Sequence, residues 1–367
     1  MEKQKTLPDP LPLYITFNQT FTLIAVGTET GFSIYDTYPL KLTYTHFLNG
    51  GIRLIDLISL NDIICLVGGG KKPAFPRNTL IIWNMTTESV EKELILEEEI
   101  ENVKMKHNKI YIVTQSKIYI YEFDNNEQCQ TIITYANPRG IFAYAMDANK
   151  YIIAYPAENK PGSVTIKYTN ENVVHSGFEV CGINERTINA HEGTIFCLAM
   201  NEDGSLLATA SKKGTLIRIF STKDGNKIQE VRRGSDQCEI NCIVFHSENK
   251  YLACYSDKGT FHLFKLNYSN DTSNIKNKRS FLGKFTEIVG IKHDYLSSEW
   301  SFAQFLVPES SKKAICAFGP ANTVIIVTEE GIYYQVEYEY DVTEKVQCNK
   351  ILNVRLSDVK EEGEDDW

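Results

Sequence analysis

The fold is decided by residues 194 to 231, which read TIFCLAMNEDGSLLATASKKGTLIRIFSTKDGNKIQEV. This stretch contains apolar runs of strand length, and the segments NEDG and KDGN between them are tight-turn sequences. Consecutive strands with short turns predict one antiparallel sheet. A second copy follows at once and reads INCIVFHSENKYLACYSDKGTFHLFKL (240 to 266). The repetition predicts a propeller blade, in which one small sheet recurs along the chain.

Similar groups of strands recur every 40 to 50 residues or so, which is the spacing of propeller blades. Further strand-length runs are TLIAVG (22 to 27), IICLVG (63 to 68) and KIYIVT (109 to 114). The predicted blades begin near residues 14, 52, 100, 140, 194, 240 and 313. We therefore expect an all-β, seven-bladed, WD40-like propeller in a single domain. Because a closed ring protects its strand edges, we also expect a monomer in solution.

One segment interrupts this rhythm within the sixth blade. Residues Asn267 to Ser298 contain no clear strand before WSFAQFLV resumes the pattern. Because loops longer than about 15 residues are uncommon in compact domains and are often functional, this insertion is a candidate functional segment.

Composition limits the classes of function. The chain has 367 residues, 43% hydrophobic and 23% charged, with a net charge of -9 that argues against nucleic acid as a partner. The beginning, MEKQKTLPDPLP, lacks the apolar run of a secretory signal, and nine irregularly spaced cysteines indicate reduced thiols. We expect a cytosolic chain with a propeller over residues 1–356 and an acidic, disordered tail over 357–367.

The segment GTLIRIFSTKDGNKIQEVRRGSD (214 to 236) resembles the signature of the PROPPIN family, the β-propellers that bind polyphosphoinositides. Its centre is the Arg-Arg-Gly at 232 to 234. One departure is Val231, where the family usually has Phe or Leu. The resemblance extends nearly end to end, through segments that include GFSIYDTYPL (31 to 40), LVGGGKKPAFPRNTLIIWN (66 to 84), NPRG (137 to 140), AHEG (190 to 193), SDKGTFHLFKL (256 to 266) and SEWSFAQF (298 to 305).

Adjacent arginines suit two separate anion sites. Successive side chains on a strand point to opposite sides, so Arg232 and Arg233 cannot easily serve one pocket. Guanidinium groups are permanently charged and fork two N–H donors onto a phosphate, and Gly234 lets the backbone turn sharply or lie close to a ligand. The ordinary alternative is that the two arginines are a solvated pair on a turn.

The resemblance implies two phosphoinositide pockets, each pairing cations with hydroxyl groups. The first consists of His191, Ser211, Lys213, Thr215, Arg218 and Arg232, and the second of Arg233, Ser247, Ser256, Lys258, Thr260 and His262. Asp236 and Glu239 lie close in sequence to the second set and would weaken it. His191 is equally consistent with a structural hydrogen bond of the kind that WD repeats use.

The long insertion carries an amphipathic pattern. Phe281, Leu282, Phe285, Ile288 and Val289 would form one apolar helical face, with basic residues on either side, which is typical of an interfacial membrane anchor. Gly283 and Gly290 lower the helix propensity, so we expect the segment to be ordered only by lipid. The alternative is a loop folded back on the propeller.

A third feature is GGGKKPAFPRNTL (68 to 80), which lies between two predicted strands. It resembles the partner-binding loop of the family, and the resemblance implies docking of the large autophagy lipid-transfer protein, with Pro76 and Arg77 as the contacts. A phosphate-binding loop of the nucleotide-binding type is excluded, since the Gly-Lys-Ser/Thr end and a following helix are missing.

Metal and catalytic sites are weakly indicated. Cys238, Cys242 and His246 are spaced by four but straddle a turn and a strand, so unrelated roles are the better interpretation. No pairing of a nucleophile with a base stands out, and we expect neither catalysis nor a cofactor. A propeller hydrolase is therefore a remote alternative.

The resemblance implies an effector that recognises phosphatidylinositol 3-phosphate, phosphatidylinositol 3,5-bisphosphate or both, and recruits autophagy machinery. Such a protein would be cytoplasmic and peripheral on autophagosome-precursor, endosomal or vacuolar membranes. The rival hypothesis is a generic WD-repeat scaffold that binds peptides and never touches lipid.

Overall fold

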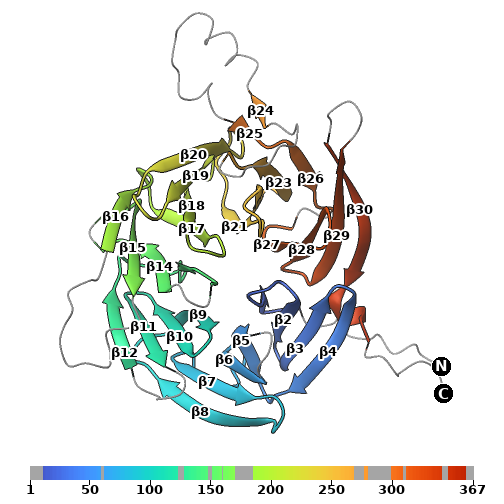
Figure 1. Ribbon diagram of the computed structural model, residues 1–367. Helices are drawn as coiled ribbons and strands as arrows, with labels where there is room; N and C mark the ends of the chain where they lie inside the picture. The colour runs from blue at the N-terminus through green and yellow to red at the C-terminus, as the bar shows by residue number, and fades with distance from the viewer. Residues whose placement is uncertain are drawn as a thin grey trace, which may run out of the picture.

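The structure is a computed structural model. It describes residues 11–58, 62–122, 128–147, 151–158, 160–169, 185–267, 277–279, 299–308, 311–340 and 346–360. Seven sheets, each built on four antiparallel strands, stand around a central axis and close into a ring (Figure 1). The predicted all-β, seven-bladed architecture is confirmed, and each predicted blade start lies within a few residues of an observed innermost strand.

Each blade is built from consecutive strands, ordered from the axis outward. Blades one to three are β1 (Tyr14–Phe17), β2 (Leu23–Thr28), β3 (Gly31–Thr37) and β4 (Leu40–Phe47); β5 (Gly51–Leu57), β6 (Ile63–Gly69), β7 (Thr79–Asn84) and β8 (Ser89–Ile95); and β9 (Ile100–Lys106), β10 (Lys109–Thr114), β11 (Lys117–Glu122) and β12 (Gln128–Ile133). Blade four is β13 (Ala143–Tyr144), β14 (Tyr151–Pro156), β15 (Ser163–Thr169) and β16 (Glu185–Asn189).

The remaining blades follow the same order. Blade five is β17 (Ile195–Met200), β18 (Leu206–Ser211), β19 (Leu216–Ser221) and β20 (Lys227–Arg232), and blade six is β21 (Ile240–Phe245), β22 (Tyr251–Ser256), β23 (Thr260–Lys265) and β26 (Ala303–Leu306). Blade seven is β27 (Ala314–Phe318), β28 (Thr323–Thr328), β29 (Ile332–Tyr340) and β30 (Val346–Arg355), followed by a 3-10 turn, Leu356–Asp358. No helix within the described ranges has the length and apolar character of a membrane span.

The core lies between neighbouring blades, because both faces of each sheet are covered. On β18, Leu207 packs in the cluster shared with blade four, whereas Leu206 and Ala208 pack in the cluster shared with blade six. This alternation follows from the two-residue period of a strand. The ring closes where Tyr333 of blade seven donates a hydrogen bond of 2.9 Å from its hydroxyl to the carbonyl of Thr37 in blade one.

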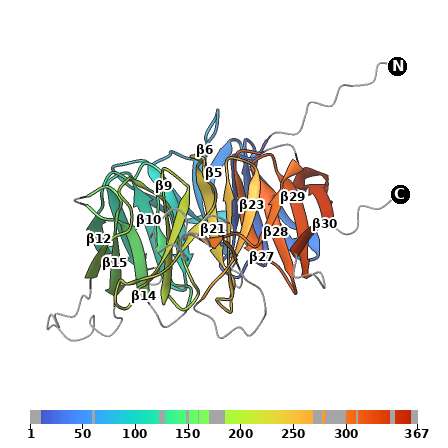
Figure 2. The same ribbon diagram turned by 90° about the horizontal axis from the view of Figure 1, so that it is seen from above.

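The connections divide between the two faces of the ring. The turn between the second and third strands of a blade lies at the same face as the link to the next blade, since the strands alternate in direction. Figure 2 shows the loop between β6 and β7, coloured blue, rising above this face. The tandem arginines lie there too, because Arg232 ends β20.

The insertion of blade six adds two short strands to blade five. β25 (Glu299–Trp300) pairs in parallel with β20, and β24 (Lys278–Arg279) pairs with β25, so that sheet has six strands (Figure 1). The prediction that residues 267 to 298 contain no strand is therefore wrong at Lys278–Arg279. Two-residue strands that pair with another blade have no periodic pattern by which the sequence would indicate them.

Candidate functional site

The tandem arginines lie on opposite sides of the outer strand of blade five. Val231 packs in the apolar cluster between blades five and six, so the next side chain, Arg232, is turned toward blade four. Arg233 follows on the blade-six side, where its Nε donates to the carbonyl of Gly214 at 3.2 Å. The two side chains are only 6% and 7% exposed. One strand end thus places the two guanidinium groups on opposite sides of blade five. We call the boundary with blade four the first groove and the boundary with blade six the second groove.

The first groove already contains an ion pair. Arg218 on β19 donates from Nε to the Glu230 carboxylate at 2.8 Å and from a terminal nitrogen to the Ala190 carbonyl at 2.7 Å. Burial would raise the pKa of Glu230, but the hydrogen bond and charge of Arg218, with help from Lys227, bring it below its ordinary value. Sequence reasoning missed Glu230, which neutralises the charge that Arg218 would offer to a phosphate.

His191 in the same groove makes a structural hydrogen bond. Its Nε2 lies 2.9 Å from the Thr209 hydroxyl and 3.2 Å from the Thr209 carbonyl. Burial, together with the positive charge of Arg218, lowers the pKa of His191 to about 4. The ring is therefore neutral at physiological pH, and it contributes no charge to an anion pocket.

The turn between β18 and β19 provides the other predicted members of the first pocket. Ser211 and Thr215 are buried at its two ends, and Lys213 is exposed between them. Gly214 has a φ of +62°, and a Cβ there would lie 1.9 Å from the Cys238 carbonyl oxygen. The turn therefore requires glycine. Arg233, on the blade-six side, donates a hydrogen bond to the backbone of this turn.

The second groove brings Arg233 close to groups from blade six. Its guanidinium also donates to the carbonyl oxygen of Asp236. Burial, followed by the positive charge of Arg233, lowers the pKa of His262 to about 4. Nδ1 of His262 lies 3.1 Å from the hydroxyl of Ser301.

Three further members of the second set lie at the same end of blade six. Ser256 is fully buried at the end of β22, Lys258 is exposed in the following turn, and Thr260 is half-buried at the start of β23. Burial raises the pKa of the Cys238 thiol, and the positive charges of Arg233 and Lys258 act in the opposite direction.

Ser247 is not brought together with this group. It lies in the turn after β21, and β21 and β22 are antiparallel with Ile240 opposite Ser256 and Phe245 opposite Leu252. The turn is therefore at the other end of the blade, where Ser247 lines a cavity of about 580 Å³ around the central channel. A serine just after a strand looks the same in sequence at either end of a blade, which is why the prediction placed it wrongly.

Asp236 and Glu239 were expected to weaken the second pocket through their carboxylates. Glu239 lies 3.7 Å from a guanidinium nitrogen of Arg139. Asp236 contacts Arg233 through its main-chain carbonyl. The expected weakening of the second pocket by these two carboxylates has no direct contact to support it.

The predicted partner-binding loop is exposed. Pro76 and Arg77 lie in the β6–β7 loop, where the carbonyl of Pro76 accepts from Thr79 at 3.1 Å and the carbonyl of Arg77 accepts from Ile100 at 3.0 Å. The Arg77 guanidinium is 3.9 Å from Glu99. Main-chain bonds thus fix the loop on blade three while leaving its side chains accessible.

The predicted membrane-insertion residues, Phe281, Leu282, Phe285, Ile288 and Val289, lie outside the described residues. The root of the insertion is described. There Gln229, Asn267, Asn277 and Glu299 form a hydrogen-bonded network against β20. Sequence reasoning missed this network, because its polar side chains carry no pattern beyond that of an ordinary loop.

Cys238, Cys242 and His246 do not form a metal site. The Cys238 thiol donates to the Gly214 carbonyl at 3.3 Å, the Cys242 sulfur lies 3.4 Å from that of Cys316, and the His246 ring packs on aromatic rings. Across the described ranges, no cluster of three or more potential metal ligands is present.

Comparisons with known proteins agree with this fold. The family model described as PROPPIN matches residues 13–319. The chain is 32% identical to autophagy-related protein 18e of Arabidopsis thaliana, covering 89% of this chain and 84% of that protein. It is 30% identical to autophagy-related protein 18 of Dictyostelium discoideum, covering 94% of both.

Solved structures show the same architecture. Hsv2 of Kluyveromyces lactis superposes with a TM-score of 0.76 at 21% identity, covering 95% of this chain and all of that one. KlAtg21, solved in complex with the coiled-coil of AgAtg16, gives a TM-score of 0.65 at 22% identity, covering 94% and 99% of the two chains. With the family model spanning most of the chain and two relatives at 30% identity or more, this protein belongs to the PROPPIN family of autophagy-related β-propellers.

Proposed function

We propose that this protein is a peripheral membrane effector that recognises phosphatidylinositol 3-phosphate, phosphatidylinositol 3,5-bisphosphate or both. The observation that carries the proposal is the position of Arg232 and Arg233 on opposite sides of one strand end, with a glycine turn between their grooves. Each groove adds an exposed lysine and hydroxyl groups, which are the donors that phosphates on an inositol ring need.

To bind a head group in the second groove, Arg233 must exchange its carbonyl acceptors for a phosphate. Arg233 donates to the carbonyls of Gly214 and Asp236, and both acceptors are neutral. A phosphate oxygen is a stronger acceptor for guanidinium than a carbonyl, since charge-assisted hydrogen bonds are roughly twice as strong as neutral ones. In the first groove, Arg232 and Lys213 would carry the interaction, because Glu230 neutralises Arg218.

The protein would contact a membrane at three points. Two head-group pockets and the apolar face at Phe281 to Val289 act on one surface, so that the second and third contacts become intramolecular. Each basic residue near an anionic surface contributes about 1 kcal/mol, which is too little for stable attachment by one pocket. We place the protein on the cytoplasmic side of autophagosome-precursor, endosomal or vacuolar membranes.

Recruitment would use the β6–β7 loop. Pro76 and Arg77 are exposed while their main chain is fixed, which suits a contact that must be both accessible and rigid. We infer that the autophagy lipid-transfer protein docks on this loop.

Liposome flotation tests the lipid-binding proposal. Replacing Arg232 and Arg233 together by threonine should abolish flotation with vesicles that contain 3-phosphorylated phosphoinositides, with the fold checked by circular dichroism. Lys223→Thr is the matched control, because Lys223 is an exposed cation in a turn at the opposite face of the same blade. Unchanged flotation of the double variant would overturn the proposal and favour a protein-binding scaffold.

A further inference from the structure

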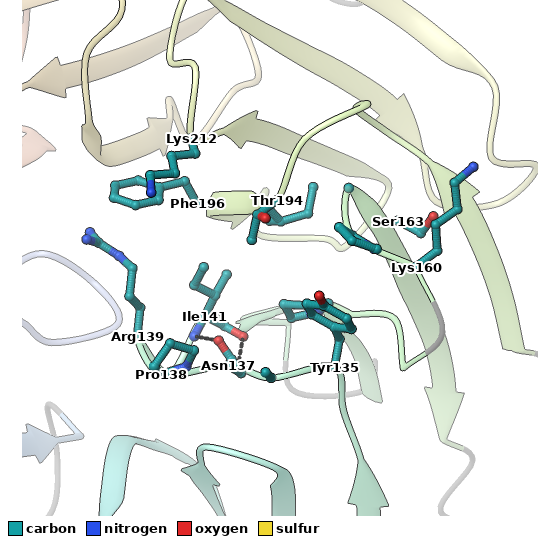
Figure 3. Close-up of a pocket in the computed structure, with 15 residues that line it drawn as sticks. Tyr135, Asn137, Pro138, Arg139, Ile141, Lys160, Ser163, Thr194, Phe196 and Lys212 are labelled. Atoms are coloured by element: carbon teal, nitrogen blue, oxygen red, sulfur yellow. Dashed lines mark hydrogen bonds between the residues drawn. The ribbon is translucent and has the colours of Figure 1, made fainter.

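A second cavity opens between blades three, four and five. It encloses about 210 Å³ (Figure 3). Its lining comes from the link between blades three and four (135 to 141), the end of β14 with the β14–β15 turn (156 to 163), and the start of β17 (194 to 196), with Lys212 at its edge. Three blades thus contribute to one hollow.

The cavity exists because the innermost strand of blade four is short. β13 pairs with β14 only at Ala143 and Tyr144, so the upper part of β14, ending in Pro156, has no inner neighbour. The link that precedes β13 instead packs against blade three at Gly140. On the other side, the register of β17 shifts between Ile195 and Cys197, so that Phe196 is the extra residue of a bulge.

The wall of the cavity is rigid before any ligand arrives. Asn137 donates from its amide to the Ile141 carbonyl at 2.9 Å and accepts from the Ile141 N–H at 2.8 Å, as the dashed lines in Figure 3 show. Gly140 has a φ of +58° and packs against Asn102, whose amide donates to its carbonyl at 2.8 Å. A preformed wall reduces the entropy lost on binding.

Cations surround the opening. The Arg139 guanidinium lies 3.6 Å from the centre of the Phe196 ring, and the Lys160 ammonium donates to Asn189 at 3.1 Å. Lys212 is exposed beside Phe196 (Figure 3). None of the residues that line the cavity is acidic. Glu239 pairs with Arg139 alone among the three cations of the lining, so the lining itself has a net positive charge.

We propose that this cavity binds one aromatic side chain of an acidic peptide segment in a partner protein. The floor of Ile141, Pro156 and Phe196 is apolar, and the volume is below the 300–1,000 Å³ or so of sites for whole small molecules. A single bulky side chain fits this space. Acidic residues on either side of it would then lie against Lys160, Lys212 and Arg139.

The same cations would also attract a membrane lipid, but the lining favours a peptide. The phosphoinositide grooves proposed above place their arginines among hydroxyl groups. Here the base is formed by prolines and aromatic rings, and the charges lie only at the rim. Amphipathic contacts with an aromatic anchor are typical of protein interfaces.

The test is fluorescence anisotropy with the labelled peptide DEDWEDE and the full chain. Thr194 projects into the middle of the cavity, so Thr194→Trp should fill it and weaken binding about tenfold. Lys212→Glu should weaken binding about two- to fivefold, with a smaller effect at high salt. The peptides DEDAEDE and KRKWKRK should bind at least about tenfold more weakly than DEDWEDE.

Matched variants separate this site from the lipid grooves. Thr87→Trp, in an exposed turn of blade two, and Lys223→Glu should leave the affinity unchanged. The Arg232→Thr, Arg233→Thr double variant should bind the peptide as the natural chain does. The proposal is overturned by failure of DEDWEDE to bind, by equal binding of DEDAEDE, or by insensitivity to Thr194→Trp. Loss of peptide binding in the arginine variant would assign these cations to the lipid surface instead.

Discussion

Gln229 on β20 donates a hydrogen bond of 2.7 Å from its side-chain amide to the carboxylate of Glu299 on β25. The amide oxygen of the same side chain accepts from the main-chain N–H of Asn267 at 3.0 Å. Asn277 donates to the Glu299 carboxylate at 2.9 Å. Both ends of the blade-six insertion are thus fastened to the outer strand of blade five, close in sequence to Arg232.

Gln229→Ala should loosen this attachment. The substitution takes the Gln229 acceptor from the Asn267 N–H and removes one of the donors to the Glu299 carboxylate, at a site where Gln229 is 6% exposed. We therefore expect a loss of about 1–3 kcal/mol in the free energy of unfolding. Vesicle binding should weaken severalfold, because the insertion is held less firmly on the strand that ends at Arg232. Binding of a soluble inositol phosphate should not change.

Gln335→Ala is the control for that experiment. Gln335 is 8% exposed on β29 of blade seven, so its truncation removes a buried amide of the same size outside the network that holds the insertion. Urea unfolding and flotation of both variants check the prediction. If vesicle binding weakens equally in the two, the network has no special part in membrane attachment.

The blades were predictable because each one repeats the same local signals. Alternating apolar residues and turn segments such as NEDG recur in the chain, and they place the innermost strands within a few residues of where they lie. Pairing across a blade boundary could not be predicted in this way. β25 joins blade five only because the folded insertion brings Trp300 beside Arg232, and two residues have no measurable period.

The site was predictable in part for the same reason. The opposite directions of Arg232 and Arg233 follow from strand alternation, which is a local property. Pairing of Arg218 with Glu230 depends on the register of β19 and β20, which places the two residues opposite each other. Ser247 was misplaced because the motif does not say at which end of the blade a turn lies.

Deleting residues Phe281 to Val289 should reduce vesicle flotation strongly. The deletion removes the apolar face whose insertion gains about 1.5–3 kcal/mol per large side chain before ordering costs. The head-group pockets remain, so binding of a soluble inositol phosphate measured by calorimetry should persist. Replacing the same segment by a glycine-serine linker of equal length controls for chain length. Full flotation of both variants would favour the rival scaffold.

Substitutions in the β6–β7 loop should separate recruitment from lipid binding. Pro76→Ala with Arg77→Ala should weaken capture of the autophagy lipid-transfer protein while leaving flotation unchanged. The fold should lose at most about 1 kcal/mol, because Arg77 makes only an exposed pair with Glu99. Arg186→Ala, an exposed cation on the outer strand of blade four, is the control. Equal capture by both variants would exclude this loop as the docking surface.

Stability should fall on acidification through the histidines near the arginines. The pKa of His191 and that of His262 are about 4 in the folded chain and about 6.5 in an unfolded one. Between these values the unfolded chain takes up protons that the folded chain does not, so stability is full above pH of about 6.5 and decreases down to about 4. Each histidine contributes about 1.4 kcal/mol per pH unit in this window.

The His191→Gln variant isolates the contribution of His191 to this pH dependence from that of His262. Glutamine does not titrate but can still hydrogen-bond to Thr209, so the difference in unfolding free energy between pH 7 and pH 5 should become smaller than in the natural chain. His107→Asn, at an exposed turn, is the control for the loss of an imidazole. A pH dependence unaltered by His191→Gln would show that the acid sensitivity comes from carboxylates.

Substitution of Gly234 tests whether the glycine is required by the fold or by a ligand. A Cβ at Gly234 would meet nothing within 4 Å, and its φ is not in the left-handed region, so the ligand-free fold does not need glycine there. Gly234→Ala should therefore leave the unfolding free energy within about 0.5 kcal/mol of the natural value. It should nevertheless weaken binding to phosphoinositide vesicles, because the added methyl group keeps a head group away from the backbone beside Arg233.

Two other glycines calibrate this result. A Cβ added at Gly193 would also meet nothing within 4 Å, so Gly193→Ala should change neither stability nor flotation. Gly214→Ala should destabilise the fold, because its Cβ would collide with the Cys238 carbonyl. If Gly234→Ala behaves like Gly193→Ala in both measurements, no head group approaches the backbone at this point, and the proposed arrangement of the two pockets is wrong.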